Sequence, residues 1–173
     1  EKEAAKTSEE EAAALTAEAE VPVVQSTSGN SDGYILDAAE LSTFGENTKA
    51  DGAEETAGTD KYFTIHYSAG TKVEAKEKEF TDGYKSVNRI NFAGAVKKTQ
   101  NSISFTTTGK AKVKVYWGAA DANREMAIIN DSGKPIAVTE VKPAKDQLCC
   151  WEVTLEDAGT YYLGGSEKKN YIF

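Results

Sequence analysis

The side chains in this sequence that could do specific chemistry are aromatic rings interleaved with Arg, Lys and Asn. Sugar rings present apolar C–H faces that stack on aromatic rings, and their hydroxyl groups require hydrogen-bond donors and acceptors. A sugar that carries a carboxylate adds charge-assisted bonds to Arg or Lys. The set therefore predicts a carbohydrate site. The candidate ligand-binding residues are Tyr84, Arg89, Asn91, Lys112, Lys114, Tyr116, Trp117 and Arg124.

The same residues also have a purely structural interpretation. Trp117 continues the apolar alternation of residues 111–117, which favours a position in the core. The two lysines of the set would keep a sheet face soluble and block edge-to-edge pairing. The two arginines would form salt bridges with carboxylates of nearby turns. The exposure of Trp117, Arg89 and Arg124 decides between these interpretations.

Catalysis has weaker support in the sequence. His66 is the only histidine, and it lies on the strand face opposite Phe63 and Ile65, which predicts a surface or strand-pairing residue rather than a general base. No GxxxxGK[ST] or GxGxxG phosphate cradle is present. Carboxylates are numerous enough for a glycosidase pair, but residues 33–173 leave little room for a catalytic cleft. We therefore expect a protein that is not an enzyme, and a small enzyme is the third hypothesis.

The sequence also gives little support for cysteine or metal chemistry. Cys149 and Cys150 are the only cysteines, and neighbours on a strand point to opposite faces, so we expect one core thiol and one outward thiol. A vicinal disulfide would require a strained geometry. Two cysteines and one histidine do not build a common structural zinc site. We expect no cofactor. A structural calcium at Asp82 or Asp121 is the open alternative to ordinary turn-capping carboxylates.

The elements that must position these residues show a two-residue rhythm after Gly33. Short stretches of alternating apolar side chains are separated by turn signals such as Asp82-Gly83. Many short strands with turns favour an all-β fold, either a sandwich or a barrel. Of the two we expect an antiparallel β-sandwich or jelly roll. Residues 37–41 suggest one helical turn, and the stretch from there to residue 60 is interpreted as a loop. The predicted strands are 62–67, 89–92, 103–107, 111–117, 126–129, 135–141, 148–155, 160–163 and 171–173.

Residues 1–32 differ in composition from the rest of the chain. Seven Glu and two Lys lie in residues 1–30, and they supply most of the net charge of −8. This Ala/Glu-rich leader is predicted to be disordered or partly helical, a solvated spacer before a domain at 33–173. A partner-binding helix is the alternative. The nearly balanced, slightly acidic domain is a poor nucleic-acid binder, and no apolar run is long enough to span a bilayer.

Three segments of the domain together carry a family resemblance. They are FTDGYKSVNRINFAG (80–94), the run 102–139 that contains VYWGAADANREM, and LEDAGTYYLGGSEKKNYIF (155–173). In this order they resemble β-sandwich accessory domains appended to pectate lyases and other large secreted or surface proteins of anaerobic gut bacteria. The resemblance covers residues 33–173. These 173 residues contain no catalytic domain, in contrast to the enzyme-linked members.

The resemblance implies a function and a location. It implies a non-catalytic carbohydrate-binding module for acidic, pectin-type polysaccharide, located outside the cell, secreted or on the cell surface, within a larger multidomain protein. It favours Arg89, Trp117 and Arg124 as contacts, with the lysines as partners of uronate groups. The alternative is a structural or adhesive spacer domain of a surface protein without a glycan ligand. That alternative predicts buried aromatic residues and arginines held in salt bridges.

Overall fold

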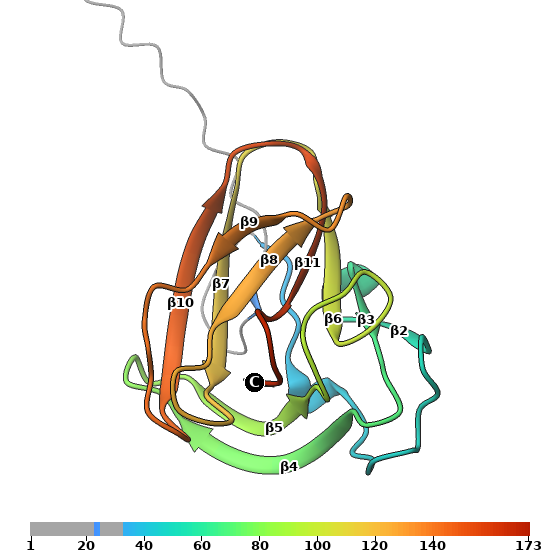
Figure 1. Cartoon of the computed structure of the whole chain (residues 1–173), viewed down its shortest axis with the longest axis vertical. Helices are drawn as coiled ribbons and strands as arrows, with labels where there is room; N and C mark the ends of the chain where they lie inside the picture. Colours follow the sequence, from blue (N-terminus) through green and yellow to red (C-terminus); the bar gives the residue numbers. More distant parts are fainter. Residues whose placement is uncertain (1–22, 25–32) are drawn as a thin grey trace, which may run out of the picture.

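The structure, a computed structural model, describes residues 23–24 and 33–173 of the chain. The alternating segments form two sheets that pack face to face as an all-β sandwich (Figure 1). The first sheet contains β4 (Lys72–Glu79), β5 (Lys85–Asn91), β12 (Tyr171–Ile172), β7 (Ala111–Gly118) and β10 (Leu148–Leu155), with β1 (Val23–Val24) also on β7. The second contains, in order, β2 (Glu54–Ala57), β3 (Phe63–His66), β6 (Ser102–Thr107), β11 (Gly159–Gly165), β8 (Met126–Asn130) and β9 (Pro135–Val138).

The named strands pair antiparallel except where β1 meets β7. β10 pairs with the whole of β7, from Leu155 opposite Ala111 to Leu148 opposite Gly118. The two residues of β1 run parallel to β7, and β12 bridges β7 to β5. Because β10 occupies one edge of β7 along its full length, β1 and β12 share the other edge.

The main core fills the space between the sheets. Val115 and Trp117 of β7 point inward and are 0% and 1% exposed. They share the cluster with Ile90 of β5 and Ile128 of β8, which come from both sheets. Each fully buried large side chain of this kind contributes about 1.5–3 kcal/mol to folding. Most of this core lies in the segments whose alternation predicted strands, and the members outside them are Leu36, Ala38, Leu41, Val73 and Ala119.

A second, smaller cluster lies on the outer face of the first sheet. The turn between β4 and β5 covers that face, and the Tyr84 ring packs against the Tyr116 ring at a tilt of 38°, with ring centroids 4.1 Å apart. Asp82 of the same turn accepts hydrogen bonds from Tyr116 Oη and from Lys114 Nζ. We call this group the outer aromatic cluster; it consists of Phe80, Tyr84, Tyr116 and Phe173.

The structure confirms the all-β class and the predicted strands from residue 62 onward, with shifted ends. The expected helical turn is a 3-10 turn, η1 (Ala38–Glu40), capped by the Asp37 side chain. One expectation was wrong: the stretch interpreted as a loop contains β2 and a second 3-10 turn, η2 (Thr59–Lys61). β4 was missed, because most of its residues are charged and Val73 is its only buried side chain, so it shows no apolar alternation.

The cysteine prediction is confirmed and the leader prediction is not tested. Cys149 is half-buried against the main core, while Cys150 is exposed and pairs in register with Tyr116 on the outer face. Both thiols are free, and burial raises the pKa of each. Apart from Val23–Val24, the predicted leader lies outside the described residues.

Candidate functional site

The three aromatic residues predicted to stack on a sugar are all buried. Trp117 is 1% exposed in the main core, and Tyr84 and Tyr116 are 1% and 0% exposed in the outer aromatic cluster. The alternation correctly placed Tyr116 on the outward face, but the β4–β5 turn covers that face. None of the three offers a ring face to a ligand, so this part of the predicted site is corrected.

Arg89 and Asn91 are held by neighbours on the outer face of the first sheet. Arg89 Nε donates to Glu74 Oε2 at 2.8 Å, and its guanidinium lies 3.6 Å from the centre of the Tyr171 ring. Asn91 is buried, and its Nδ2 donates to the same Glu74 oxygen at 3.4 Å. A pocket of about 220 Å³ adjoins Arg89, Tyr171 and Lys78. The charge of Arg89 is already paired, as the structural interpretation predicts.

The two lysines of the predicted site occupy the same face of β7. Lys114 Nζ lies 3.0 Å from Asp82 Oδ2, and this contact together with the Tyr116 hydroxyl raises the pKa of Lys114 despite the opposing effect of burial. Lys112, two residues before Lys114 on the same face of the strand, is exposed. Lys114 is therefore part of the support of the outer aromatic cluster, while a role of Lys112 in ligand binding stays a prediction.

His66 takes part in a chain of contacts that the sequence did not suggest. Its Nε2 lies 2.8 Å from Ser104 Oγ, and its Nδ1 lies 3.0 Å from Glu54 Oε1. The distances resemble those of a nucleophile, base and carboxylate, but His66 Nδ1 has no hydrogen-bond partner of suitable geometry among the described residues. However, Ser104 belongs to β6, which pairs with β3 and β11 on its two edges, so its neighbouring N–H groups are used by the sheet. Because these N–H groups are not available as oxyanion donors, we assign the contacts to joining β2, β3 and β6.

The two carboxylates considered for calcium accept backbone hydrogen bonds. Asp82 Oδ1 accepts from the N–H of Tyr84 at 3.1 Å, and Asp121 Oδ1 accepts from the N–H of Ala122 at 2.9 Å. In residues 23–24 and 33–173 no group of three or more His, Cys, Asp or Glu side chains is placed to hold a metal ion. The Asp82 contact, two residues along the chain, is that of an ordinary turn-capping aspartate, while Asp121 contacts the residue next to it.

Arg124 lies at one end of the sandwich, where two loops meet. Residues 119–125 connect β7 to β8, and residues 166–170 connect β11 to β12. The buried Asn170 side chain joins them: its Nδ2 donates to the carbonyl of Glu125 at 2.8 Å, and its Oδ1 accepts from the N–H of Ala120 at 3.3 Å. The N–H of Ser166 donates to the same Glu125 carbonyl at 2.9 Å. The loops are thus held together by buried hydrogen bonds.

Two backbone features shape this junction. Asn123 adopts a positive φ of 58°, a conformation that asparagine tolerates better than most residues, and the next residue is Arg124. At Gly165 a Cβ would lie 1.9 Å from the carbonyl oxygen of Lys168, so only glycine allows the 166–170 loop to turn back this closely. Both features bring the loops around one hollow.

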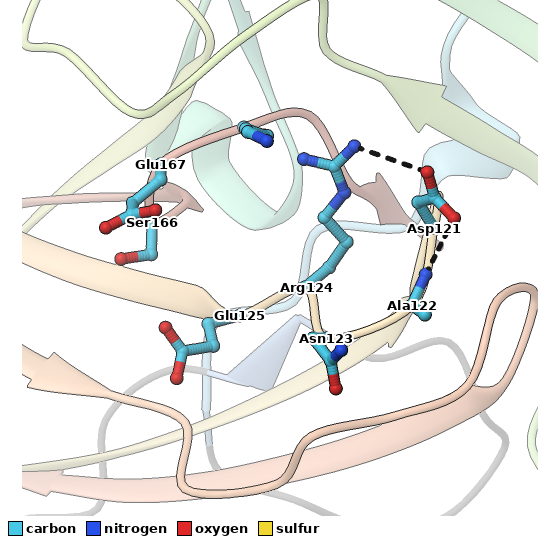
Figure 2. A pocket seen from close by; sticks show the side chains of 8 residues that line it. Asp121, Ala122, Asn123, Arg124, Glu125, Ser166 and Glu167 are labelled. Atoms are coloured by element: carbon cyan, nitrogen blue, oxygen red, sulfur yellow. Dashed lines mark hydrogen bonds and ion pairs between the residues drawn. The ribbon is translucent and has the colours of Figure 1, made fainter.

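The hollow, which we call the Arg124 pocket, has a volume of about 220 Å³. Figure 2 shows the Arg124 guanidinium directed between the two loops, with Asp121 on one side and Ser166 and Glu167 on the other. The side chains of Asn123 and Glu125 point away from it. Its lining residues are Asp121, Ala122, Asn123, Arg124, Glu125, Ser166, Glu167 and Lys168.

Arg124 is poorly compensated by the protein groups around it. Its side chain is only 17% exposed, and its Nε is buried without a hydrogen-bond partner among the described residues. The Nη2 atom approaches Asp121 Oδ2 only to 3.9 Å, which is too long for a hydrogen bond. Glu125 does not serve it either, because it forms an ion pair with Lys142. A buried guanidinium in this position favours an additional anionic or strongly accepting group.

The sequence identified Arg124 but missed the loop opposite it. Ser166, Glu167 and Lys168 contain no aromatic residue and no motif, so no pattern marked them. The usable signal was the pair Gly164-Gly165 before a short polar run that ends in Asn170, which is typical of a tight turn with a close backbone approach.

Comparison with known proteins adds no identity to this geometry: no protein-family model matches the chain, and no curated protein matches it. The argument for function therefore depends on the site alone. The described residues also contain no helix with the length and apolarity needed to cross a membrane.

Proposed function

We propose that this chain is a non-catalytic carbohydrate-binding domain that captures a carboxylate of an acidic, pectin-type polysaccharide at the Arg124 pocket. In this proposal it belongs to a larger secreted or cell-surface protein and tethers that protein to its substrate. The single observation that carries the proposal is the under-compensated Arg124 guanidinium at the opening between two loops.

The chemistry of the pocket suits a carboxylate-bearing sugar. A guanidinium presents parallel N–H donors that match the two oxygens of a carboxylate, and such charge-assisted pairs are stronger than neutral hydrogen bonds. Ser166 and Lys168 line the same pocket and offer groups for sugar hydroxyls. The pocket is smaller than the about 300–1,000 Å³ of sites that enclose drug-sized ligands. It therefore suits one uronate unit of a chain rather than a long buried segment.

The position of Asp121 beside Arg124 leads to a specific prediction. Its Oδ2 is the carboxylate oxygen 3.9 Å from Arg124 Nη2, and its side chain is 61% exposed. A ligand carboxylate must compete with it for the guanidinium. Removing the Asp121 charge should therefore strengthen binding, whereas removing Arg124 should abolish it.

The test is affinity electrophoresis in native gels that contain homogalacturonan, xylan or glucan. We expect retardation by homogalacturonan alone, loss of retardation in Arg124→Ala, and stronger retardation in Asp121→Asn. Loss of charge-assisted hydrogen bonds worth about 1.5–3 kcal/mol each corresponds to at least a tenfold weaker interaction. Arg89→Lys is the matched control, because Arg89 is already paired with Glu74 and should not affect binding.

The spacer or adhesive domain is the second candidate, and one observation favours it. Trp117, Tyr84 and Tyr116 are buried, so these residues provide no stacking surface for a sugar. Under this hypothesis Arg124 supports the loops only. Equal mobility of the unmodified chain in all three gels would support the spacer and overturn the carbohydrate proposal.

A further inference from the structure

The four outer edges of the two sheets differ in how they are protected against pairing with another strand. An unprotected edge strand exposes backbone N–H and C=O groups that can pair with a second chain. The β4 edge is highly charged, and its register shifts between Ala75 and Lys78. The β2 edge has four residues, two of them Glu. The β9 edge is equally short, begins with Pro135, and also has a register irregularity against β8.

β10 carries none of these protections. It has eight residues, LCCWEVTL, with Glu152 as its only charge and no proline. Its register on β7 is uninterrupted from Leu148 to Leu155. Among the described strands only β7 pairs with it, so its other edge is open in this part of the chain.

The segment that leads into β10 is also unusually apolar at its surface. Ile136, Val138 and Val141 are 45%, 40% and 55% exposed, and they are three of the four large exposed hydrophobic residues in the described part of the chain. On β10 itself Cys149, Trp151 and Val153 are only partly buried against the main core. Neighbouring apolar exposure of this kind marks interaction surfaces.

We propose that β10 is the strand through which two copies of this chain pair edge to edge, antiparallel, about a two-fold axis. Such an axis keeps the core-facing side chains of both copies on one face of the joined sheet. A core-facing residue can then lie only opposite a core-facing residue, and an outward-facing residue only opposite an outward-facing one. The axis must therefore pass through a residue position. Two positions, Trp151 and Glu152, allow seven residues to pair.

Charge decides between these two registers. An axis at Glu152 places that carboxylate directly opposite its own copy, and like charges in opposite positions destabilise a sheet. An axis at Trp151 instead places Trp151 opposite Trp151 and Cys149 opposite Val153, which continues the apolar stripe across the junction. On the outer face it places Cys150 opposite Glu152 twice, once for each copy. The open edge of β10 is therefore complementary to the same edge of a second copy of this chain.

The test changes the charge at Cys150, the residue that lies opposite Glu152 in the proposed dimer. The full chain is examined under reducing conditions by sedimentation equilibrium, at concentrations up to about 1 mM, the weak end of measurable association. We expect a reversible monomer–dimer equilibrium. Cys150→Asp creates two like-charge pairs and should raise the dimer dissociation constant about 2- to 30-fold, whereas Cys150→Lys creates two opposite-charge pairs and should lower it.

The matched control is Thr56→Asp, an exposed position on the β2 edge, which should leave the dissociation constant unchanged. Circular dichroism and thermal unfolding confirm that each variant is folded. A chain that stays monomeric at the highest concentration overturns the proposal. A dimer that responds to the two Cys150 substitutions in the same direction overturns it as well, because the register would be wrong.

Discussion

Arg89 and Arg124 show how residues of one type acquire different roles from their surroundings. Both were predicted as contacts for an acidic sugar. Arg89 forms a 2.8 Å ion pair and stacks on a tyrosine, which compensates its charge. Arg124 has a contact of 3.9 Å and a buried Nε without a hydrogen-bond partner among the described residues. The difference comes from neighbours distant in sequence, so composition and spacing could not separate the two.

At the same scale, Asp82 should make folding stability depend on acid pH. The hydrogen bond from Tyr116 is the main cause that lowers the pKa of Asp82 from 3.8 to about 2. Because the folded-state pKa is the lower one, the contribution is fully present above about pH 4 and is lost as the pH falls through about 2. We expect Asp82→Asn to unfold at lower urea concentration at pH 7 and to show a shallower loss of stability between pH 4 and pH 2.

The measurement is the urea midpoint followed across that pH range. Asp157→Asn, at an exposed carboxylate of another turn, is the control and should keep the slope of the parent chain. If Asp82→Asn kept that slope too, the acid dependence would arise elsewhere and the contact of Asp82 with Tyr116 would contribute little.

At the scale of elements, the 166–170 loop depends on one glycine. A Cβ at Gly165 would meet the Lys168 carbonyl at 1.9 Å, so Gly165→Ala must displace the loop that forms one side of the Arg124 pocket. We expect a loss of about 1–3 kcal/mol in unfolding free energy, as for other overpacked sites, together with weaker retardation by homogalacturonan. Gly109→Ala is the matched control, because a Cβ there has nothing within 4 Å.

Chemical denaturation measures the first effect and affinity electrophoresis the second. Unchanged stability in Gly165→Ala would show that the loop can move away from Gly165 without loss. Unchanged binding in a destabilised variant would show that the 166–170 loop does not take part in ligand binding. Binding would then depend on Arg124 and the 119–125 loop alone.

At the scale of the whole molecule, the core residues of the described part of the chain all lie within 33–173. Among them the main core begins at Leu36, and every member of the outer aromatic cluster lies later in the chain. We therefore expect a chain that lacks residues 1–32 to fold, with a β-type circular dichroism spectrum. Its thermal midpoint should fall by no more than the about 2–4 °C that corresponds to 1 kcal/mol in a domain of about 150 residues.

Scanning calorimetry checks this expectation against the full chain. The only described contact that is removed is the two-residue pairing of β1 with Val115 and Lys114. A shortened chain with a helical spectrum or without a cooperative transition would contradict both the domain boundary and the fold argument. If β10 also pairs two copies, two Arg124 pockets would be presented together, and binding to a long polymer would gain from the shared attachment.

The strands were predictable where one face of a strand is buried and the other is not. Ala111, Val113, Val115 and Trp117 alternate with polar or outward residues, and the structure places all four in the main core. β4 was not predictable in this way, since an edge strand with Val73 as its only buried side chain has no reason to alternate. The burial of Tyr84 and Tyr116 was hidden for a related reason: alternation indicates which face of a sheet a residue occupies, and not what later covers that face.

By itself, the sequence determined the all-β class, and that Cys149 and Cys150 lie on opposite faces of a strand. These follow from the pleat, which is a local property of two successive residues. Only the tertiary structure decided that Arg89 is paired while Arg124 is not, that a turn buries two outward tyrosines, and that β10 is left as an open edge. These depend on contacts between segments far apart in the chain, which no local pattern encodes.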